Sequence, residues 1–294
     1  MISHDTKPPL LGRPGNFFQG KNSMHNLLGS FRVIAVAISM VAMGSGCAVV
    51  SNSPTTDQRQ SLAPAGALRV GVYPGSPLSY LKDGASGEAR GLIHDLGKVL
   101  AERLGVKFEL VEMRTLAEVL AAVKSGRVDF AGTNVTPARA ADMDFTPALL
   151  DIELGYLVAL GSAITSVNQL NQPGTRVGVT QGSTSQTTLP GILKSATIVP
   201  APTLKNASEM LSQRSIDAFA TNKVLLFEMS DGLQGSRVLD GQWGVERWAF
   251  AIPKGREVGM GYLRQFAEDA VARGLVKRAG ERAGLRGTVP SRAQ

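Results

Sequence analysis

The chain has 294 residues, and its first 46 hold four basic residues and one acidic one, so the rest carries about +4 of the formal net charge of +7. This charge is too small and too dispersed to indicate a nucleic-acid partner. Only His94 and the single cysteine, Cys47, lie beyond residue 46, which excludes a zinc cluster built on these residue types. No cofactor or metal is expected, and His94 is interpreted as a structural residue on a helix flank.

The first 47 residues are predicted to be a leader. Residues 31–43 are apolar behind Arg32, a length typical of a signal-peptide core and shorter than the ~20 residues of a membrane span. Met24 is an alternative start. The segment 44–47 resembles a lipoprotein cleavage box, which predicts lipidation of Cys47, and cleavage after Ala48 is the alternative. Residues 48–66, rich in Ser, Thr, Pro and Gln, are expected to form a flexible tether.

Strands alternate with helices from residue 68 onward, which predicts an α/β fold with a largely parallel sheet and ligands at the carboxyl ends of its strands. The elements expected in the first half are a strand at 68–73, a helix at 91–104 closed by Gly105, a strand at 106–111, and a helix that is capped by Thr115 and Glu118 and ends at Gly126.

The stretch 129–139 combines a strand with a helix start and an arginine. An apolar strand ends in Thr133 and Asn134, and Thr136 and Pro137 then have the N-cap and first-turn preferences of a helix. Arg139 falls in the first turn, where a cation opposes the helix dipole unless an anion lies between them. The stretch is therefore predicted to bind a carboxylate.

The second half repeats this plan. Its expected elements are a crossing strand at 154–158, a strand at 176–180, a helix beginning at Ser183 and Thr184, a helix at 207–214 capped by Asn206, a strand at 216–221, a return strand at 248–252, an amphipathic helix around 262–270 and a short basic helix around 275–282.

Two internal echoes indicate two similar lobes. Residues 69–76 and 176–183 agree at six of eight positions. Asp129, Thr133 and Asn134 align with Asp217, Thr221 and Asn222 at one offset, as Thr115 does with Thr203. We expect one lobe to comprise 67–155 and 248–285, the other to comprise 156–247, and a tail to follow at 286–294.

The order of these motifs resembles the bacterial extracellular solute-binding proteins of family 3, the amino-acid receptors of ABC importers. The resemblance rests on Arg-Val-Gly-Val at 69–72, the segments 91–96 and 125–130, Thr-Pro-Ala-Arg-Ala at 136–140, Asp-Phe-Thr at 144–146, and 178–184. It implies a two-lobed periplasmic-binding-protein type II fold that closes on its ligand about a two-strand hinge.

The resemblance also implies a ligand site. The family's carboxylate-binding arginine falls on Arg139, and its second-lobe carboxylate site falls on 182–184. The ammonium-binding aspartate of the family falls on Asn222, which brings no charge. The residues expected to bind the ligand are Gly132, Thr133, Asn134, Arg139, Ser183, Thr184, Asn222, Ser76 and Tyr80. The ligand is therefore predicted to keep a carboxylate without having to be an ordinary α-amino acid.

The leading hypothesis is a monomeric, lipid-anchored periplasmic protein that captures a small carboxylate-bearing solute and delivers it to an ABC permease. One alternative is an enzyme like the cyclohexadienyl (prephenate or arogenate) dehydratases of this fold. It needs a carboxylic acid of raised pKa, for which Asp151, Glu153 and Glu209 are available. The other alternative is a lipid-tethered sensor.

Overall fold

The computed structural model describes residues 53–289, so Cys47 and the predicted leader lie outside the described residues. The helices are α1 (Thr56–Leu62), α2 (Leu92–Leu104), α3 (Leu116–Lys124), α4 (Pro137–Asp142), α5 (Thr184–Ile192), α6 (Leu204–Ser212), α7 (Lys223–Gly232), α8 (Glu257–Ala272) and α9 (Leu275–Ala283), with a 3₁₀ turn, η1, at Val167–Gln169. No helix in this part of the chain is long and apolar enough to span a bilayer.

The strands are β1 (Ala67–Val72), β2 (Leu81–Lys82), β3 (Ala89–Arg90), β4 (Lys107–Glu112), β5 (Ala131–Asn134), β6 (Met143–Phe145), β7 (Leu150–Val158), β8 (Arg176–Thr180), β9 (Thr197–Ala201), β10 (Ala218–Asn222), β11 (Arg237–Val238), β12 (Gly244–Pro253) and β13 (Thr288–Val289). Most predicted elements agree with these bounds to within a few residues, and the predicted strand at 176–180 coincides with β8.

In the first lobe, β1 pairs in parallel with β4 and forms a parallel bridge to Phe130 just before β5. Alternate residues of a strand point to opposite faces. Val70 therefore packs in the core with α2 and α8, while a side chain at Gly71 would meet Val119 and Val128 on the α3 face. Helices thus cover both faces of this sheet, as the alternating strands and helices predict.

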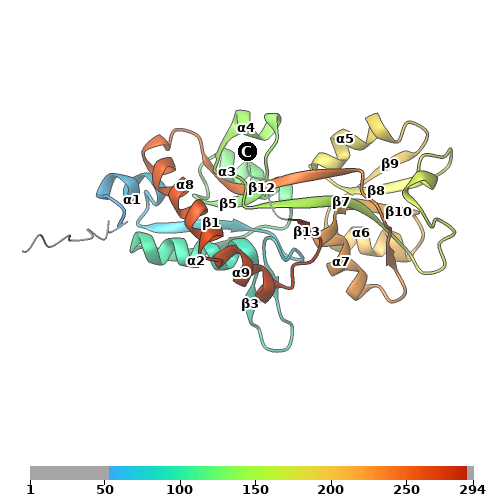
Figure 1. The fold of residues 1–294 in the computed structure, drawn as a ribbon, viewed down its shortest axis with the longest axis horizontal. Helices are drawn as coiled ribbons and strands as arrows, with labels where there is room; N and C mark the ends of the chain where they lie inside the picture. Colours follow the sequence, from blue (N-terminus) through green and yellow to red (C-terminus); the bar gives the residue numbers. More distant parts are fainter. Residues whose placement is uncertain (1–52, 290–294) are drawn as a thin grey trace, which may run out of the picture. The chain divides into compact units, whose positions relative to one another are not determined.

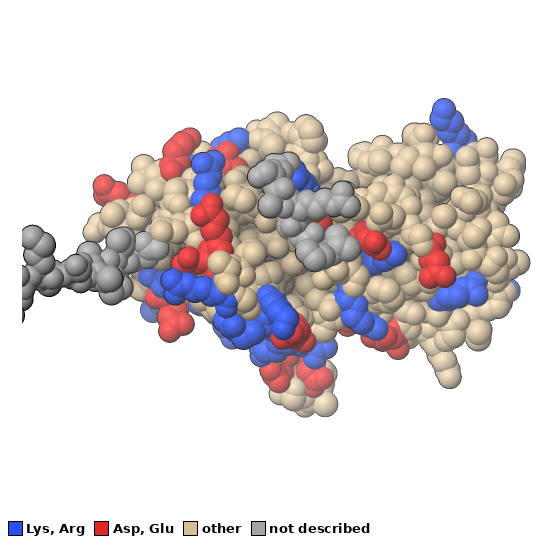
Figure 2. All heavy atoms as spheres, in the orientation of Figure 1, with Lys and Arg blue, Asp and Glu red and all other residues tan. Residues whose placement is uncertain are grey.

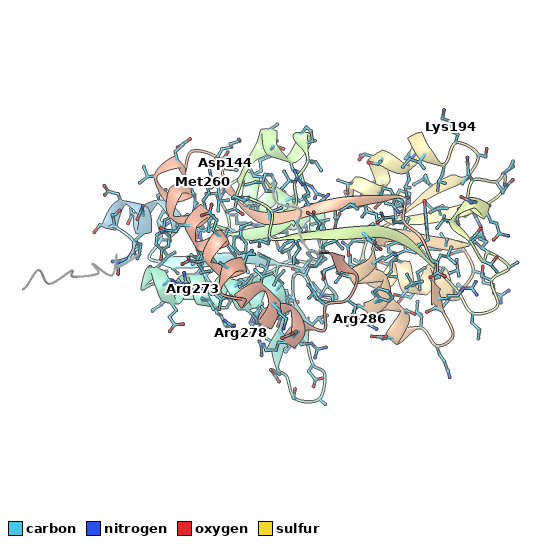
Figure 3. The ribbon with its side chains drawn as sticks, viewed as in Figure 1. Asp144, Lys194, Met260, Arg273, Arg278 and Arg286 are labelled. Atoms are coloured by element: carbon cyan, nitrogen blue, oxygen red, sulfur yellow. The ribbon has the colours of Figure 1, made fainter. Side chains whose placement is uncertain are left out.

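In the second lobe, β10, β8 and β9 are parallel neighbours, and β7 joins β10 in antiparallel register. Two clusters of buried side chains fill this lobe, one around Tyr156 and Val177 and the other around Phe219 and Leu226. Figure 3 labels Lys194, which follows α5 in this lobe, and Met260 in α8 of the first.

Two long antiparallel strands connect the lobes. β7 and β12 pair along Leu150–Leu154 and Gly244–Trp248, and Figure 1 shows them running side by side from one lobe into the other. The structure therefore confirms a two-lobed α/β fold with a two-strand crossing. Both strands are longer than the predicted segments, 154–158 and 248–252, because their pairing continues through the crossing.

The lobes repeat one ion pair at equivalent positions. In the first, Nη2 of Arg69 lies 2.7 Å from Oδ1 of Asp129; in the second, Nη2 of Arg176 lies 2.8 Å from Oδ1 of Asp217. Each arginine also donates its backbone N–H to Oδ2 of the same aspartate. The repeated Arg-Val-Gly-Val and Asp positions of the sequence thus form the same ion pair in both lobes.

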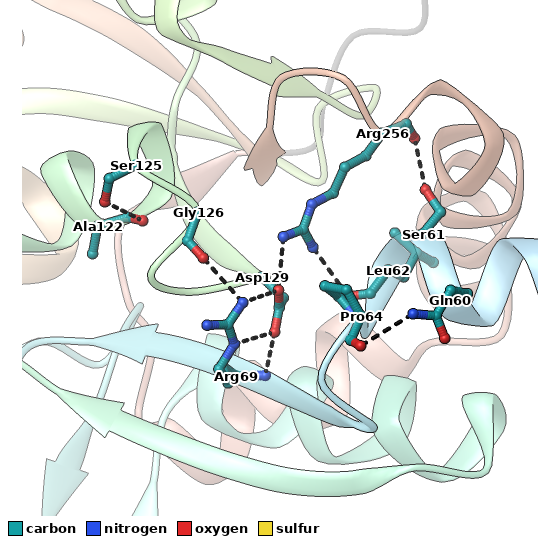
Figure 4. A network of polar contacts seen from close by, with 10 residues as sticks. All are labelled: Gln60, Ser61, Leu62, Pro64, Arg69, Ala122, Ser125, Gly126, Asp129 and Arg256. Carbon is teal, nitrogen blue, oxygen red and sulfur yellow. Dashed lines mark hydrogen bonds and ion pairs between the residues drawn. The ribbon is translucent and has the colours of Figure 1, made fainter.

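Residues 55–62 differ from the predicted flexible tether. Thr55 and Gln58 form a capping box that begins α1, and Leu62 is buried in the first-lobe core. Nη1 of Arg256 donates to the carbonyl of Leu62, as Figure 4 shows. Ser61 Oγ also accepts from the backbone N–H of Gly259. The helix is thereby attached to α8, so the folded unit begins before residue 67.

One helix start also differs from the prediction. α6 begins after Thr203, whose Oγ1 accepts from the N–H of Asn206, so Asn206 lies inside the helix and does not cap it. Thr203 is the counterpart of Thr115, which caps α3 in the same way. The internal sequence repeat therefore locates the start of α6 better than the local sequence does.

The C-terminal helix α9 is tied to the beginning of α2. Arg282 forms ion pairs with Glu88, at 2.7 Å, and Asp95, at 2.6 Å, and Asp95 in turn contacts Nδ1 of His94 at 2.7 Å. His94 is buried between Tyr80 and Phe108, in keeping with a structural role. Figure 2 shows lysine and arginine side chains mingled with acidic ones on the face it presents.

Candidate functional site

A narrow cavity lies between the two lobes; its space for the centres of water-sized molecules is about 40 Å³, within about 550 Å³ of atom-free space that includes open solvent. Residues from the carboxyl ends of β5, β8 and β10 line it, as expected for an α/β sheet. The predicted site residues that line it are Gly132, Thr133, Asn134, Arg139, Ser183, Thr184 and Asn222.

Arg139 occupies the predicted helix position, and its side chain is buried. Thr136 caps α4 by accepting from the N–H of Arg139 over 3.2 Å. Nη1 of Arg139 donates to Oγ1 of Thr133 over 2.6 Å and also to Oδ1 of Asn134. Within residues 53–289 no carboxylate forms an ion pair with this guanidinium, and its Nε has no hydrogen-bond partner there. The site therefore holds a buried cation with donors left for an anion.

Burial, more than a helix dipole, sets the electrostatics of Arg139. The side chain is 8% exposed, and its desolvation lowers the pKa of the guanidinium. α4 has only six residues, so its dipole is short. The charge of Glu246 acts on this pKa in the opposite direction. A buried cation without an ion-pair partner attracts an anion strongly, because water screens both charges poorly there.

Both lobes contribute to the surroundings of Arg139. Nη2 lies 3.5 Å from the carbonyl oxygen of Gly182, which precedes α5. Nδ2 of Asn134 donates to Oγ1 of Thr184 over 3.1 Å, and Ser183 caps α5 by accepting from the N–H of Gln186. The lobes thus touch directly around the cavity, and Ser183 combines its cap role with a place in the lining.

Thr180 lines the cavity and was not among the predicted site residues. It ends β8, is 7% exposed, and its Oγ1 has no hydrogen-bond partner in the described structure. Leaving a buried hydroxyl unpaired costs about 1–3 kcal/mol. A ligand with a polar group next to Thr180 can remove this cost.

Asn222 ends β10 and caps α7. Its Oδ1 accepts from the N–H of Leu225 over 3.1 Å, and its Nδ2 donates to Oε1 of Glu246 over 2.8 Å. One lone pair of the acceptor atom is therefore used by the helix, and the donor points to Glu246.

Glu246 is the functional group that the sequence analysis missed. It lies on β12, lines the cavity, and burial raises the pKa of its carboxyl to about 7, although the hydrogen bond from Asn222 and the charge of Arg139 lower it. Its neighbours Val245 and Arg247 are exposed, so the local sequence resembles that of a surface strand. Successive side chains of a strand point to opposite faces, so the alternation along β12 is the signal that distinguishes Glu246 from Val245 and Arg247.

Ser76 and Tyr80 do not lie in the lining of the cavity. Ser76 is fully buried in a turn bridged to Tyr80, and Tyr80 packs against the ring of His94 at 5.8 Å between centroids. The turn packs on the first-lobe core, where Tyr80 contacts His94 of α2. Tyr73, from the segment after β1, is the aromatic residue of this region that reaches the cavity.

The acids named for the dehydratase alternative lie elsewhere. Glu153 forms an ion pair with Lys223 at 2.6 Å, and neither Asp151 nor Glu209 lines the cavity. Glu209 is on the exposed side of α6, 3.8 Å from Lys205. In the described structure no group of three or more His, Cys, Asp or Glu residues is arranged to hold a metal.

These features define a class: a two-lobed protein that binds a small ligand between its lobes. A family model described as bacterial extracellular solute-binding proteins, family 3, matches residues 68–279. The chain belongs to this family, which confirms the predicted membership and a solute-binding role.

Two characterised relatives are binding components of transporters. The ABC transporter glutamine-binding protein GlnH of Bacillus subtilis (strain 168) is 26% identical over 193 residues, or 63% of this chain and 69% of that protein. The glutamine-binding protein of Geobacillus stearothermophilus is 26% identical over 214 residues, or 71% of this chain and 81% of that protein. The relatives thus support a binding protein over an enzyme.

Solved structures agree on the fold. The ancestral amino acid-binding protein AncCDT-1, a precursor of cyclohexadienyl dehydratase, is 26% identical with a TM-score of 0.67, and the match covers 76% of this chain and 98% of that one. The amino acid ABC transporter substrate-binding protein AbpA of Streptococcus pneumoniae, bound to L-arginine, is 23% identical with a TM-score of 0.70, covering 76% and 97%. At this identity the second match supports the fold alone.

Proposed function

We propose that the protein captures a small carboxylate-bearing solute between its lobes and delivers it to an ABC permease. The observation that carries this proposal is the buried guanidinium of Arg139, which lines the cavity without a carboxylate partner among the described residues. A ligand carboxylate can take the donors that Thr133 and Asn134 leave unused, in a charge-assisted and potentially bidentate contact.

The surrounding polar groups suit the same ligand. Oγ1 of Thr180 lacks a partner within the described structure, and Thr184 and Ser183 line the cavity from the start of α5. Residues from both lobes therefore meet one ligand, so binding favours the closed arrangement of the lobes. The names of the glutamine-binding relatives support a ligand among amino acids or closely related solutes.

Calorimetry on the purified full chain tests this function. The panel contains the twenty L-amino acids, their 2-hydroxy acids and simple mono- and dicarboxylates. We expect Arg139→Ala to weaken the best ligand at least about 30-fold, because loss of a buried charged contact costs about 2–5 kcal/mol. Arg114→Ala, at a side chain 87% exposed, is the matched control and is expected to bind like the wild type.

The same variant separates binding from folding. Without ligand, Arg139→Ala is expected to melt at or above the wild-type temperature, because removing a buried cation without a carboxylate partner relieves a desolvation cost. Unchanged affinity in Arg139→Ala, or no binding of any carboxylate, contradicts the proposal. Turnover of prephenate by the wild type would favour the dehydratase alternative instead.

A further inference from the structure

Asn222 presents a hydrogen-bond donor to the cavity at the position where the family carries its ammonium-binding aspartate. Its Oδ1 is used by the N–H of Leu225 and its Nδ2 by Glu246, so the two contacts fix the orientation of the amide. Oδ1 of Asn222 already accepts from Leu225 and is neutral, so Asn222 offers a ligand ammonium a shared acceptor without a negative charge.

The carboxyl of Glu246 supplies a charged acceptor beside Asn222. One of its oxygens, Oε1, accepts from Asn222, and Oε2 has no hydrogen-bond partner among residues 53–289. Among the described residues that line the cavity, only Arg139 and Glu246 carry a charge, and they form no ion pair with each other. The cavity thus has one positive and one negative pole, which interact electrostatically with each other.

We propose that Glu246 receives the cationic group of a zwitterionic ligand whose carboxylate lies at Arg139, with Asn222 as the positioning residue. The inference rests on the proposed function, since it assumes a carboxylate at Arg139. It narrows the ligand to small solutes that carry both an ammonium and a carboxylate group, such as α-amino acids. The charged acceptor for the ligand ammonium then lies on β12, beside Asn222 of β10.

The electrostatic surroundings couple this contact to pH. Arg139 from α4 and Tyr73 from the segment after β1 interact with Glu246. On the adjoining strand β7, Ile152 is the register partner of Glu246, Glu153 is paired with Lys223 of α7, and Asp151 is the register partner of Arg247. Because burial raises the pKa of Glu246 to about 7, a ligand ammonium displaces a proton near neutral pH.

The test compares each L-amino acid that binds with its own 2-hydroxy acid, for example L-leucine with L-2-hydroxyisocaproate. The wild type at pH 8 is expected to prefer the amino acid at least ten-fold. Glu246→Gln, of nearly the same shape, is expected to lose this preference, with retained circular dichroism as the folding check. Glu153→Gln removes a nearby carboxylate outside the cavity and is expected to keep the preference.

A pH series supplies the second readout. Wild-type affinity for the amino acid is expected to rise from pH 6 to pH 8, by up to about ten-fold per pH unit below the pKa of Glu246. This rise should disappear in Glu246→Gln. Asn222→Ser keeps an oxygen for the helix cap but removes the donor to Glu246, so the rise is expected to shift to higher pH.

The outcomes separate this inference from the proposed function. If Arg139→Ala abolishes binding of both ligands while Glu246→Gln still prefers the amino acid, the inference is wrong and the proposed function stands. A wild type that binds the 2-hydroxy acid as tightly as the amino acid also overturns it. If Arg139→Ala binds both like the wild type, the proposed function itself fails.

Discussion

Arg69 and Asp129 form a two-point ion pair in which Nε donates to Oδ2 over 2.8 Å and Nη2 donates to Oδ1 over 2.7 Å. The carboxylate of Asp129 is fully buried, and Nη2 of Arg256 lies 2.8 Å from the same Oδ1. One buried anion therefore connects β1, the start of β5 and the segment before α8, as Figure 4 shows. The equivalent pair in the second lobe, Arg176 and Asp217, is 41% and 32% exposed.

This difference in burial predicts unequal stability effects for one substitution. Asp129→Asn is expected to lower the free energy of unfolding by about 3–5 kcal/mol, because it leaves two arginines without their buried partner. Asp217→Asn is expected to cost about 1 kcal/mol or less, because solvent screens the second pair. Urea unfolding measures both variants. Equal losses of unfolding free energy in the two variants would show that burial does not set the contribution of this ion pair.

Helix α1 is predicted to belong to the cooperative folded unit. Leu62 is 1% exposed in the first-lobe core, so Leu62→Ala should lower the free energy of unfolding by about 2–5 kcal/mol. Leu160→Ala, at a side chain 64% exposed, is the control and should stay within about 0.5 kcal/mol of the wild type. Thermal unfolding of both variants decides whether residues 55–62 act as a helix or as the flexible tether expected from composition.

Gly132 is predicted to be required by packing, in addition to its place at the cavity. A Cβ on Gly132 would lie 2.2 Å from Cη2 of Trp248 and 2.5 Å from the side chain of Ile93. Gly132→Ala should therefore cost about 1–3 kcal/mol of stability, since the core must shift to accept the methyl group. Gly84→Ala, where a Cβ meets open space, should have little effect. Similar melting temperatures for the two variants would contradict this prediction.

Glu246 is predicted to make the ligand-free protein less stable as pH rises. Its pKa is raised from 4.5 to about 7, so the folded state binds more protons than the unfolded state between these values. The stabilisation that the protonated Glu246 contributes to the folded state is fully present below about pH 4.5. It is lost as pH rises toward 7, by up to about 1.4 kcal/mol per pH unit.

The unfolding free energy of the wild type minus that of Glu246→Gln, followed from pH 4.5 to pH 8, isolates this contribution. The difference should fall between pH 4.5 and about pH 7 and level off above that pH. Glu153→Gln is the control for a nearby carboxylate outside the cavity. A wild-type minus Glu246→Gln difference that stays flat with pH would show that the carboxyl titrates at an ordinary pKa.

Local residue preferences determined several helix starts of this protein, and sequence repeats predicted its two lobes. Thr136, Pro137 and Ser183 start helices where their cap and first-turn preferences predict, because these preferences depend on only a few neighbouring residues. The repeated Arg-Val-Gly-Val and Asp positions predict two like lobes. The cavity position of Arg139 also follows from its motif, although its role in ligand binding stays a prediction.

Only the tertiary structure decided which polar groups face the cavity. Glu246 lies between two exposed residues in the sequence, and it reaches the cavity because β12 crosses between the lobes and Asn222 approaches it from β10. Ser76 and Tyr80 lie in a turn whose direction depends on the core beneath it. Such placements arise from contacts between segments far apart in the chain. The alternation along a strand separates its two faces, but it does not show which face meets the cavity.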